Sequence, residues 1–128
     1  MNGNKNGKGT DYNKNGKIVY KGYYVNALFE GNGTCVYPNG DIYIGQFRSG
    51  LKHGKGKLHY KNKKLKYEGD FNNNKIEGNG KYIFENGDYY IGQFKDNKRE
   101  GKGRLLKKDG KVIYEGDFHN DEYLLYKN

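Results

Sequence analysis

The side chains that most often carry catalysis are scarce in this sequence. Its only thiol, its only serine hydroxyl and its imidazoles belong to five residues: Cys35, Ser49, His53, His59 and His119. Ser49 and His53 are close in sequence, but no carboxylate occurs between Asp41 and Glu68 to orient the histidine as a Ser-His-Asp triad requires. With so few candidate groups, we expect no enzyme activity, no bound metal and no cofactor.

Two pairs of carboxylates recur along the chain, at Glu68/Asp70 and Glu115/Asp117. Residues i and i+2 of a β-strand point to the same side, so each pair could hold a cation or act in acid–base chemistry. The neighbouring segments are rich in lysine, however, and charge pairing across strands explains the same pattern. We therefore interpret these carboxylates as structural.

Residues 42–67 carry eight basic side chains and no acidic one, which nearly equals the net charge of +9 of the whole chain. Within this segment we predict a basic patch formed by Lys52, Lys55, Lys57, Lys61, Lys63, Lys64 and Lys66. Such a cluster fits an ordinary solvated face, a surface for anionic membrane lipid or a surface for an acidic protein segment. Nucleic acid is disfavoured as a partner, because the aromatic side chains that would stack on bases are needed in the protein's own core.

The overall composition describes one small domain. The chain has 128 residues, of which 33% are hydrophobic and 16% aromatic, and so many aromatic residues argue against disorder. No apolar run approaches the roughly 20 residues of a membrane span, and no secretory signal is recognised. The single cysteine excludes an intrachain disulfide, so we expect a cytoplasmic protein.

The glycines and tyrosines follow a regular repeat, which is the strongest signal in the sequence. A Gly-x-Gly pair recurs five times, at residues 7/9, 31/33, 54/56, 78/80 and 101/103. Between these pairs lies a Tyr-x-Gly-x-aromatic motif, which begins at Tyr20, Tyr43, Tyr67, Tyr90 and Tyr114. The tyrosine spacing alternates between 23 and 24 residues, so a unit of two repeats is duplicated with a period of 47.

Each repeat is predicted to form a β-hairpin. The Tyr and Phe of the motif share one strand face with the glycine between them, and the missing side chain lets an aromatic ring lie over the backbone. Both glycines of each Gly-x-Gly pair should offer the same flat surface. No segment has helical periodicity, so the hairpins should pair side by side into a single-layer antiparallel sheet.

The turns agree with this fold. Ala27, Gly50, Asn74 and Asn97 occupy equivalent turn positions, and they are mostly residue types that accept a positive φ. Asn-Gly or Asp-Gly steps at residues 15–16, 39–40, 86–87 and 109–110 predict the return turns. Asn62-Lys63 is the exception, since lysine stands in the glycine position, and this turn should be strained or of another type.

One repeat array is predicted to span residues 1–128. It comprises a half repeat at 7–19, four repeats at 20–42, 43–66, 67–89 and 90–113, and a C-terminal half repeat or cap at 114–128. In this last segment Tyr123-Leu124-Leu125-Tyr126 takes the place of Gly-x-Gly. The tail packs as a cap, or the chain is a piece of a longer array; the sequence leaves both open.

At these residues the chain resembles the MORN (membrane occupation and recognition nexus) repeat family, whose pattern is Tyr-x-Gly-x-Trp/Phe, a loop and Gly-x-Gly. The second repeat fits best, with Tyr43, Gly45, Phe47, Gly50, His53, Gly54 and Gly56 at the family's positions. Ala27 replaces the loop glycine, and Glu30, Glu77 and Glu100 replace the histidine. The resemblance implies an elongated, twisted sheet curled into a groove, and non-enzymatic work as a scaffold near membrane or cytoskeleton.

We predict that the apolar side of the sheet receives a protein partner. A single-layer sheet leaves apolar surface uncovered, so an apolar helix or segment of a partner, or a second copy of the chain, would cover it. The predicted groove is lined by Tyr43, Phe47, Leu58, Tyr60, Tyr67, Phe71, Tyr82, Phe84, Tyr90 and Phe94. The alternatives are a peripheral membrane module that binds anionic phospholipid through the basic patch, and a regulatory array from a larger protein.

Overall fold

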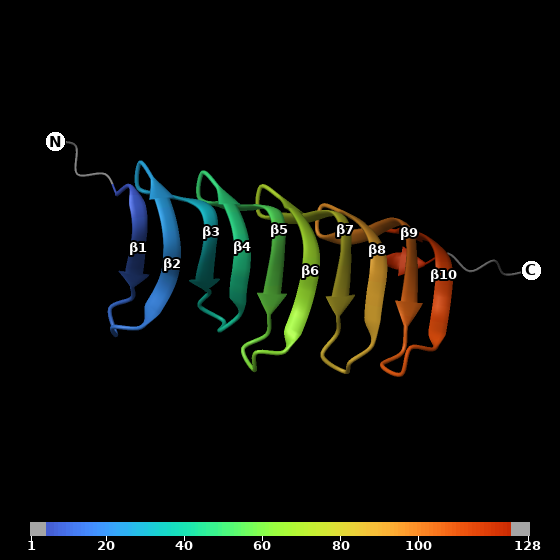
Figure 1. Cartoon of the computed structure of the whole chain (residues 1–128). Coiled ribbons are helices and arrows are strands. Elements are labelled where there is room, and N and C mark those ends of the chain that lie inside the picture. Colours follow the sequence, from blue (N-terminus) through green and yellow to red (C-terminus); the bar gives the residue numbers. More distant parts are fainter. Residues whose placement is uncertain (1–4, 124–128) are drawn as a thin grey trace, which may run out of the picture.

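A computed structural model describes residues 5–123 as one open antiparallel sheet. Its eleven strands are arranged in space in the order of the sequence, so each strand pairs only with its neighbours in the chain. Figure 1 shows them following one another along the molecule, from β1 at one end to β10 near the other. The strands are β1 (Gly7–Tyr12), β2 (Ile18–Val25), β3 (Leu28–Val36), β4 (Ile42–Arg48), β5 (Leu51–His59), β6 (Leu65–Asn72), β7 (Lys75–Ile83), β8 (Tyr89–Lys95), β9 (Lys98–Leu106), β10 (Val112–His119) and β11 (Glu122–Tyr123). The predicted all-β, single-layer array of consecutive hairpins is confirmed.

The turns inside the repeats, between their two strands, have the conformation that glycine and asparagine favour. In all five, from Asn26-Ala27 to Asn120-Asp121, both central residues have positive φ, which is the mirror-image turn that matches the twist of a hairpin. Each turn is also bonded to the preceding repeat. The Asn74 N–H donates to the Lys52 carbonyl at 2.8 Å, and the Asn97 N–H donates to the Ile76 carbonyl at 3.0 Å.

The return turns on the other edge are closed by an asparagine or aspartate side chain. The Asn39 Oδ1 accepts the Asp41 N–H at 2.9 Å, and the Asn62 Oδ1 accepts the Lys64 N–H at 3.0 Å. Lys63 has φ 73° where the other return turns have glycine. The turn is therefore of the same kind as its neighbours, and lysine in the left-handed region makes it the strained one.

The strand pairs joined by return turns alternate between two kinds, and this alternation explains the period of 47. Every second one of these pairs contains a β-bulge. The strand register shifts in the pairings β1–β2, β5–β6 and β9–β10, where Val19, Lys66 and Ile113 are the extra residues. The pairings β3–β4 and β7–β8 run in register without such a shift. The alternating repeat length is thus an alternation between bulged and plain hairpins.

The motif tyrosines form the interior of the sheet. Tyr20, Tyr43, Tyr67 and Tyr90 have no exposed surface, although only one layer of strands surrounds them. This burial follows from a second set of bulges, which shift the register between the motif glycine and the motif aromatic residue, as between Gly45 and Phe47. Bulges bend a sheet, and here the bend brings the strand over the tyrosine ring.

Each motif tyrosine also bonds to its own bulge. The Tyr43 hydroxyl donates to the Gln46 carbonyl at 2.7 Å, and the hydroxyls of Tyr20, Tyr67, Tyr90 and Tyr114 make the same bond three residues ahead. This bond gives a reason for tyrosine, and not phenylalanine, at the first motif position. The second aromatic position needs only a ring, which packs edge-on against the tyrosine, as Phe47 does against Tyr43 with centroids 5.0 Å apart.

The ring-over-glycine arrangement is confirmed for the second glycine of each pair only. A Cβ atom on Gly56 would collide with the ring of Tyr43, and one on Gly80 with the ring of Tyr67. The first glycine does not lie under a ring, contrary to the prediction. Gly54 has φ 80° within the bulge, and a side chain there would meet Gln46. The first glycine is therefore required by the backbone conformation.

At the C-terminal end of the described chain, two aromatic rings stack on each other. Tyr123 in β11 lies against Tyr114, with ring centroids 4.5 Å apart. The predicted cap residues Leu124, Leu125 and Tyr126 lie outside the described residues.

Candidate functional site

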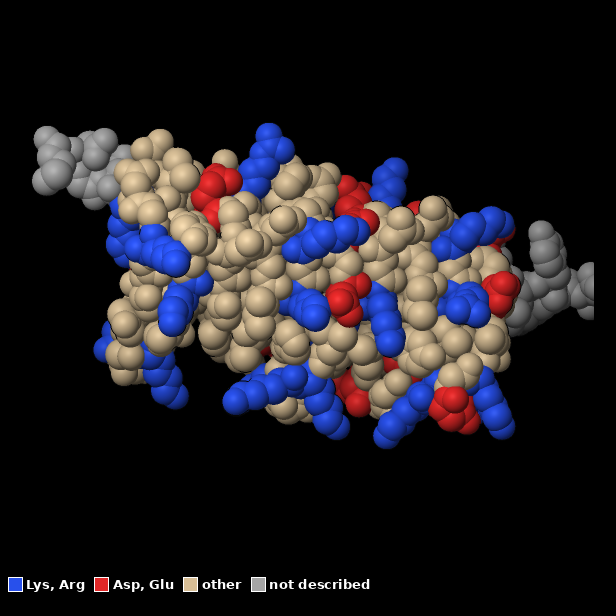
Figure 2. Space-filling model, viewed as in Figure 1, with Lys and Arg blue, Asp and Glu red and all other residues tan. Residues whose placement is uncertain are grey.

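The structure separates the residues of the predicted basic patch. Three of its lysines form ion pairs with acidic residues that flank the acid-free segment. Lys55 pairs with Asp70, Lys57 with Glu68 at 3.7 Å, and Lys66 with Asp41 at 2.9 Å. Figure 2 shows basic side chains spread along the length of the visible face, with acidic side chains interspersed among them.

These pairs also account for most of the repeated carboxylates. Asp70 and Glu68 bind the lysines of β5, and Asp117 binds Lys102 at 2.6 Å. The Asp70 carboxylate in addition accepts the Asn79 N–H at 2.9 Å. The interpretation of these three carboxylates as cross-strand charge partners is confirmed.

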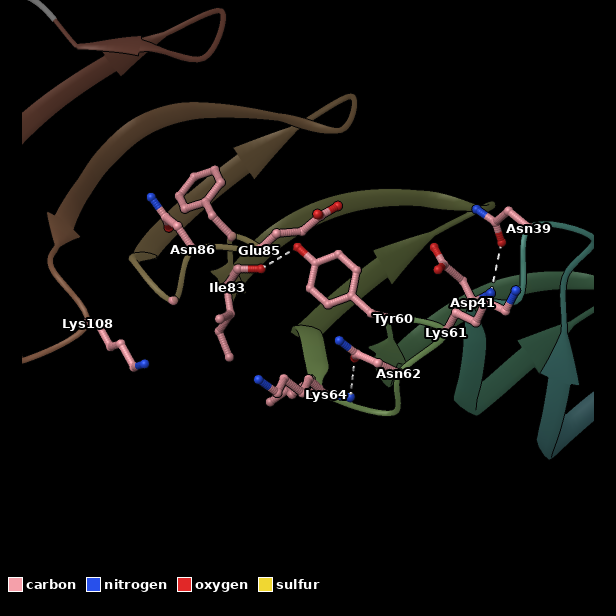
Figure 3. Close-up of a pocket in the computed structure, with 13 residues that line it drawn as sticks. Asn39, Asp41, Tyr60, Lys61, Asn62, Lys64, Ile83, Glu85, Asn86 and Lys108 are labelled. Carbon is pink, nitrogen blue, oxygen red and sulfur yellow. Dashed lines mark hydrogen bonds between the residues drawn. The ribbon is translucent and has the colours of Figure 1, made fainter.

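Lys61, Lys63 and Lys64 remain together as a group, which we call the lysine turn. All three are exposed in the return turn between β5 and β6, and none forms an ion pair among residues 5–123. The lysine turn borders a pocket of about 870 Å³ between successive return turns (Figure 3). Tyr60, Leu65, Ile83 and Phe84 supply its apolar lining, and the Tyr60 hydroxyl donates to the Ile83 carbonyl at 2.6 Å.

Lys52 does not belong to the basic patch, which corrects the prediction. Lys52 shares the strand alternation of Gly56 and Leu58 and pairs with Phe47, so it lies on the side of the buried tyrosines. Its ammonium group is 4.8 Å from the centroid of the Tyr37 ring, 5.8 Å from that of Tyr43 and 5.9 Å from that of Phe71. We call this side of the sheet the aromatic face.

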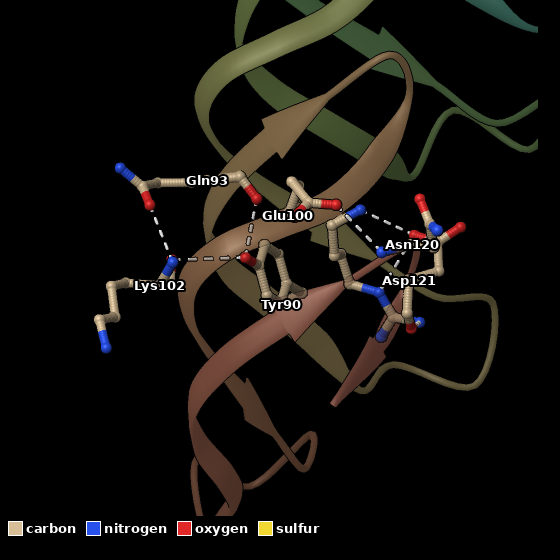
Figure 4. Close-up of polar contacts among 7 residues, drawn as sticks. Tyr90, Gln93, Glu100, Lys102, Asn120 and Asp121 are labelled. Atoms are coloured by element: carbon tan, nitrogen blue, oxygen red, sulfur yellow. Dashed lines mark hydrogen bonds and ion pairs between the residues drawn. The ribbon is translucent and has the colours of Figure 1, made fainter. Parts of the chain in front are cut away.

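Arg99 occupies the equivalent position one period later. The predicted site did not include it, although strand alternation places it on the same face as Gly103 and Leu105. Its guanidinium carbon lies 5.6 to 5.9 Å from the centroids of Phe84, Tyr90 and Phe118. The Arg99 Nε lies 3.4 Å from the Asp121 Oδ1. Figure 4 shows Asp121 and the nearby Tyr90, whose hydroxyl donates to the Gln93 carbonyl. The signal that could have found this position is its pattern through the repeats: Phe29, Lys52, Ile76, Arg99 and Tyr123 each pair with the motif aromatic residue.

The residues predicted to line a groove form two layers on the aromatic face. Six of them belong to the buried core: Tyr43, Phe47, Tyr67, Phe71, Tyr90 and Phe94. The other four, Leu58, Tyr60, Tyr82 and Phe84, are half-buried and reach the surface. Solvent therefore reaches mainly this outer layer, which lies over the buried rings.

A hollow of about 200 Å³ opens on the aromatic face. Its walls include Tyr82, Phe84, Phe94 and Arg99, and the rings of Tyr82 and Phe84 lie 5.3 Å apart. Burial raises the pKa of the Tyr90 hydroxyl beneath this region to about 12, so the core tyrosines are neutral at physiological pH.

The candidate catalytic side chains occupy structural positions. Ser49 lies in the turn between β4 and β5, where its N–H donates to the Glu30 carboxylate at 3.0 Å. Cys35 is half-buried against the aromatic core, and burial raises the pKa of its thiol. Among residues 5–123 no group of three or more His, Cys, Asp or Glu side chains is placed to hold a metal ion. Glu30 and Glu77, which replace the family's histidine, each accept a turn N–H of the next repeat.

The fold and its repeated aromatic interior define the class of the protein as a β-hairpin repeat array. The family model described as MORN repeat matches residues 20–42, 43–64, 67–89 and 90–112. The chain therefore belongs to the MORN repeat family, as its motifs predicted. The matches begin at the same four tyrosines as the predicted repeats. No curated protein matches the chain in sequence at a significant level.

Membership of this family indicates an interaction module associated with membranes or lipids, and it is a binding repeat, not an enzyme family. In the part of the chain that the structure describes, no helix is long and apolar enough to cross a bilayer.

Proposed function

We propose that the protein is a non-enzymatic scaffold that docks an apolar helix or extended segment of a partner protein on its aromatic face, close to membrane or cytoskeleton. The observation that carries the proposal is the half-buried outer layer of this face. Leu58, Tyr82, Phe84 and Leu105 pack on the buried rings and remain partly open to solvent, with no second layer over them among the described residues. Tyrosine suits such a surface, because it offers a large apolar area with few rotatable bonds.

The opposite side of the sheet supports the choice of face. Its exposed apolar residues include Ile91, whose cross-strand partners are the charged residues Lys81 and Arg104. Isolated apolar side chains are usual on any protein surface, whereas a continuous apolar layer marks an interaction site. Ile91 thus provides a matched control for experiments on the aromatic face.

Site-specific photo-cross-linking tests the proposal. A photoreactive phenylalanine analogue at position 82 or 84 is expected to give a covalent adduct with a second protein, while the same analogue at position 91 is not. The mass of the adduct separates a foreign partner from a second copy of the chain. Cross-linking of equal yield at positions 82 and 91 would contradict the assignment of the aromatic face.

Truncation of Tyr82 measures the same contact as an affinity. If its ring is an anchor, Tyr82→Ala is expected to cost about 2 kcal/mol, which is roughly a 30-fold loss of affinity for the cross-linked partner. Ile91→Ala should leave the affinity within twofold. Thermal melting of both variants must show an intact fold, and unchanged affinity of a folded Tyr82→Ala variant would remove this residue from the interface.

A second candidate function is binding of anionic phospholipid through the lysine turn. It is supported by the three exposed lysines of this turn, of which Lys61 and Lys64 line the partly apolar pocket. Lysines beside apolar side chains could receive both a phosphate and part of an acyl chain. Each lysine near an anionic leaflet contributes about 1 kcal/mol.

We expect flotation of the protein with phosphatidylserine-containing vesicles to be weak and to depend on salt. The Debye length falls from about 8 Å at physiological ionic strength to about 3 Å at 1 M, so binding should disappear at the higher value. Combined replacement of Lys61, Lys63 and Lys64 by glutamate should abolish flotation. The control variant replaces Lys14, Lys17 and Lys111 with glutamate, which changes the net charge by the same amount in other return turns. If both variants lose flotation equally, net charge alone explains the binding and the lysine turn has no specific role.

A further inference from the structure

Two cations on the aromatic face are equivalent by the internal duplication. Lys52 lies over Tyr37, Tyr43 and Phe71, and Arg99 lies over Phe84, Tyr90 and Phe118. Every member of the first set is 47 residues before the corresponding member of the second. The same three ring positions therefore surround a cation in each half of the array, and the two sites can be compared group by group.

The two sites differ in the acidic partner. The Asp121 Oδ1 accepts the Arg99 N–H at 2.8 Å and also lies 3.4 Å from the guanidinium Nε, so this cation has a carboxylate of its own. Asn74 takes the place of Asp121 at the first site, where its Oδ1 accepts the Lys52 N–H at 2.9 Å. The Asn74 side chain therefore preserves the hydrogen bond to the Lys52 backbone N–H but carries no negative charge.

Lys52 obtains no compensating charge from other described residues. Its ammonium group donates only to the neutral Tyr37 hydroxyl, at 3.4 Å, among residues 5–123. The carboxylate of Asp41 is engaged by Lys66 at 2.9 Å. Burial lowers the pKa of Lys52; the Cys35 thiol opposes this shift, and the nearby charge of Lys66 adds to it. A half-buried cation without a carboxylate partner is unfavourable in the free protein, and a partner that supplies one removes that cost.

We propose that Lys52 binds the carboxylate of an Asp or Glu side chain on the protein segment that docks on the aromatic face. This inference rests on the proposed scaffold function and names the chemistry of the partner. The acidic side chain would sit among apolar ones, since rings surround Lys52 on the aromatic face. Its contact with Lys52 would be a charge-assisted hydrogen bond in a partly desolvated place, where such bonds are strongest. At Arg99 the partner needs no acid, because Asp121 already fills that role.

The position of Lys52 favours a peptide carboxylate over a lipid phosphate. Lys52 lies at the start of β5, close to the turn between β4 and β5, whereas the lysine turn lies at the other end of β5. The Lys52 ammonium carries one positive charge and is surrounded by three aromatic rings. Such a site suits a single carboxylate that is flanked by apolar side chains. The exposed lysine turn is the better place for a membrane surface.

Three variants with the same change in net charge test the proposal. Lys52→Met removes the cation and keeps an unbranched apolar side chain. Asn74→Asp supplies the carboxylate from within the protein, as Asp121 does, and keeps the bond to the Lys52 N–H. Lys57→Met is the control, because this lysine is exposed on the opposite side of the sheet.

The probe is a displayed library of random peptides, selected on the full chain and counter-selected on Tyr82→Ala so that only aromatic-face binders remain. We expect the selected peptides to share one Asp or Glu flanked by apolar residues. The affinity of a selected peptide should fall at least tenfold for Lys52→Met and for Asn74→Asp, and less than twofold for Lys57→Met. Replacement of the shared acid by its amide should cost tenfold against the parent protein and less than twofold against Lys52→Met.

The contrary outcomes separate this inference from the proposed function. Peptides that bind the aromatic face without any preference for an acid would overturn the role of Lys52 and leave the scaffold function standing. Selection that yields no aromatic-face binder would overturn both. If Lys52→Met instead reduces binding to phosphatidylserine vesicles and not to peptides, the site takes lipid phosphate and the peptide proposal is wrong.

Discussion

Replacement of Tyr67 by alanine is expected to lower the free energy of unfolding by about 3–5 kcal/mol, the usual cost of removing a fully buried aromatic ring. Tyr67 has no exposed surface and packs edge-on against Phe71 and Phe94, with centroids 5.1 and 5.4 Å away. It thus joins two successive repeats. Because small domains are stable by only about 5–15 kcal/mol, this single change should remove a large part of the total. Urea denaturation followed by circular dichroism measures it.

Two further variants divide the effect into its parts. Tyr67→Phe removes only the hydroxyl, which donates to the Asp70 carbonyl at 2.9 Å, and should cost about 1 kcal/mol. Tyr23→Ala removes an exposed ring from the other side of the sheet and should stay within about 0.5 kcal/mol. Similar values for Tyr67→Ala and Tyr23→Ala would contradict the packing described here.

The second large effect is expected from a valine at Gly80. The backbone of Gly80 is not in the left-handed region, so the cost arises from space alone. A Cβ atom there would lie 2.5 Å from the Cε1 and Cζ atoms of Tyr67, and the ring has no room to withdraw. We expect Gly80→Val to lower the free energy of unfolding by about 3 kcal/mol, at the upper end of usual overpacking costs.

Asn79→Val is the matched control, because it places the same side chain on the adjacent, exposed residue. Its effect should be within about 0.5 kcal/mol. In a Tyr67→Ala background the cost of Gly80→Val should fall, since the ring that it strikes is gone, and a double-mutant cycle reports this coupling. Strictly additive effects would show that the ring and the glycine do not contact each other.

Most of the fold was predictable because its determinants are local and repeated. Tyr43, Gly45 and Phe47 reveal a strand by alternation, and the recurrence of this triplet reveals the array. The turn residues Asn74 and Asn97 were identified as positions that accept positive φ, and both have it. In each case one residue type reports one backbone requirement, so no knowledge of tertiary contacts was needed.

The bulges beside the Gly-x-Gly pairs could not be predicted from alternation, because the two extra residues between Gly56 and Lys52 leave the alternation of faces unchanged. The predicted basic patch grouped Lys52 with Lys55 and Lys57 because the three lysines are close in the sequence. Strict alternation along β5 places Lys52 on the side of Gly56 and Leu58, and the structure has it there, paired with Phe47. Comparison across the repeats carries this information, since Phe29 and Ile76 hold the same position with apolar side chains. The ion pairs of Lys55 and Lys66 depend on which strands meet, which the acid-free stretch of sequence does not show.

The matching order of strands in space and in sequence has a consequence for how the chain folds. Every strand pairs with the one before and the one after it, so no contact within the sheet requires distant parts of the chain to find each other. The contact order is low for an all-β protein, and the entropy lost in closing loops is correspondingly small. Folding can begin at any hairpin and spread to its neighbours in both directions, as in other linear repeat proteins. A nascent chain could therefore fold progressively, each new hairpin adding to the sheet already formed.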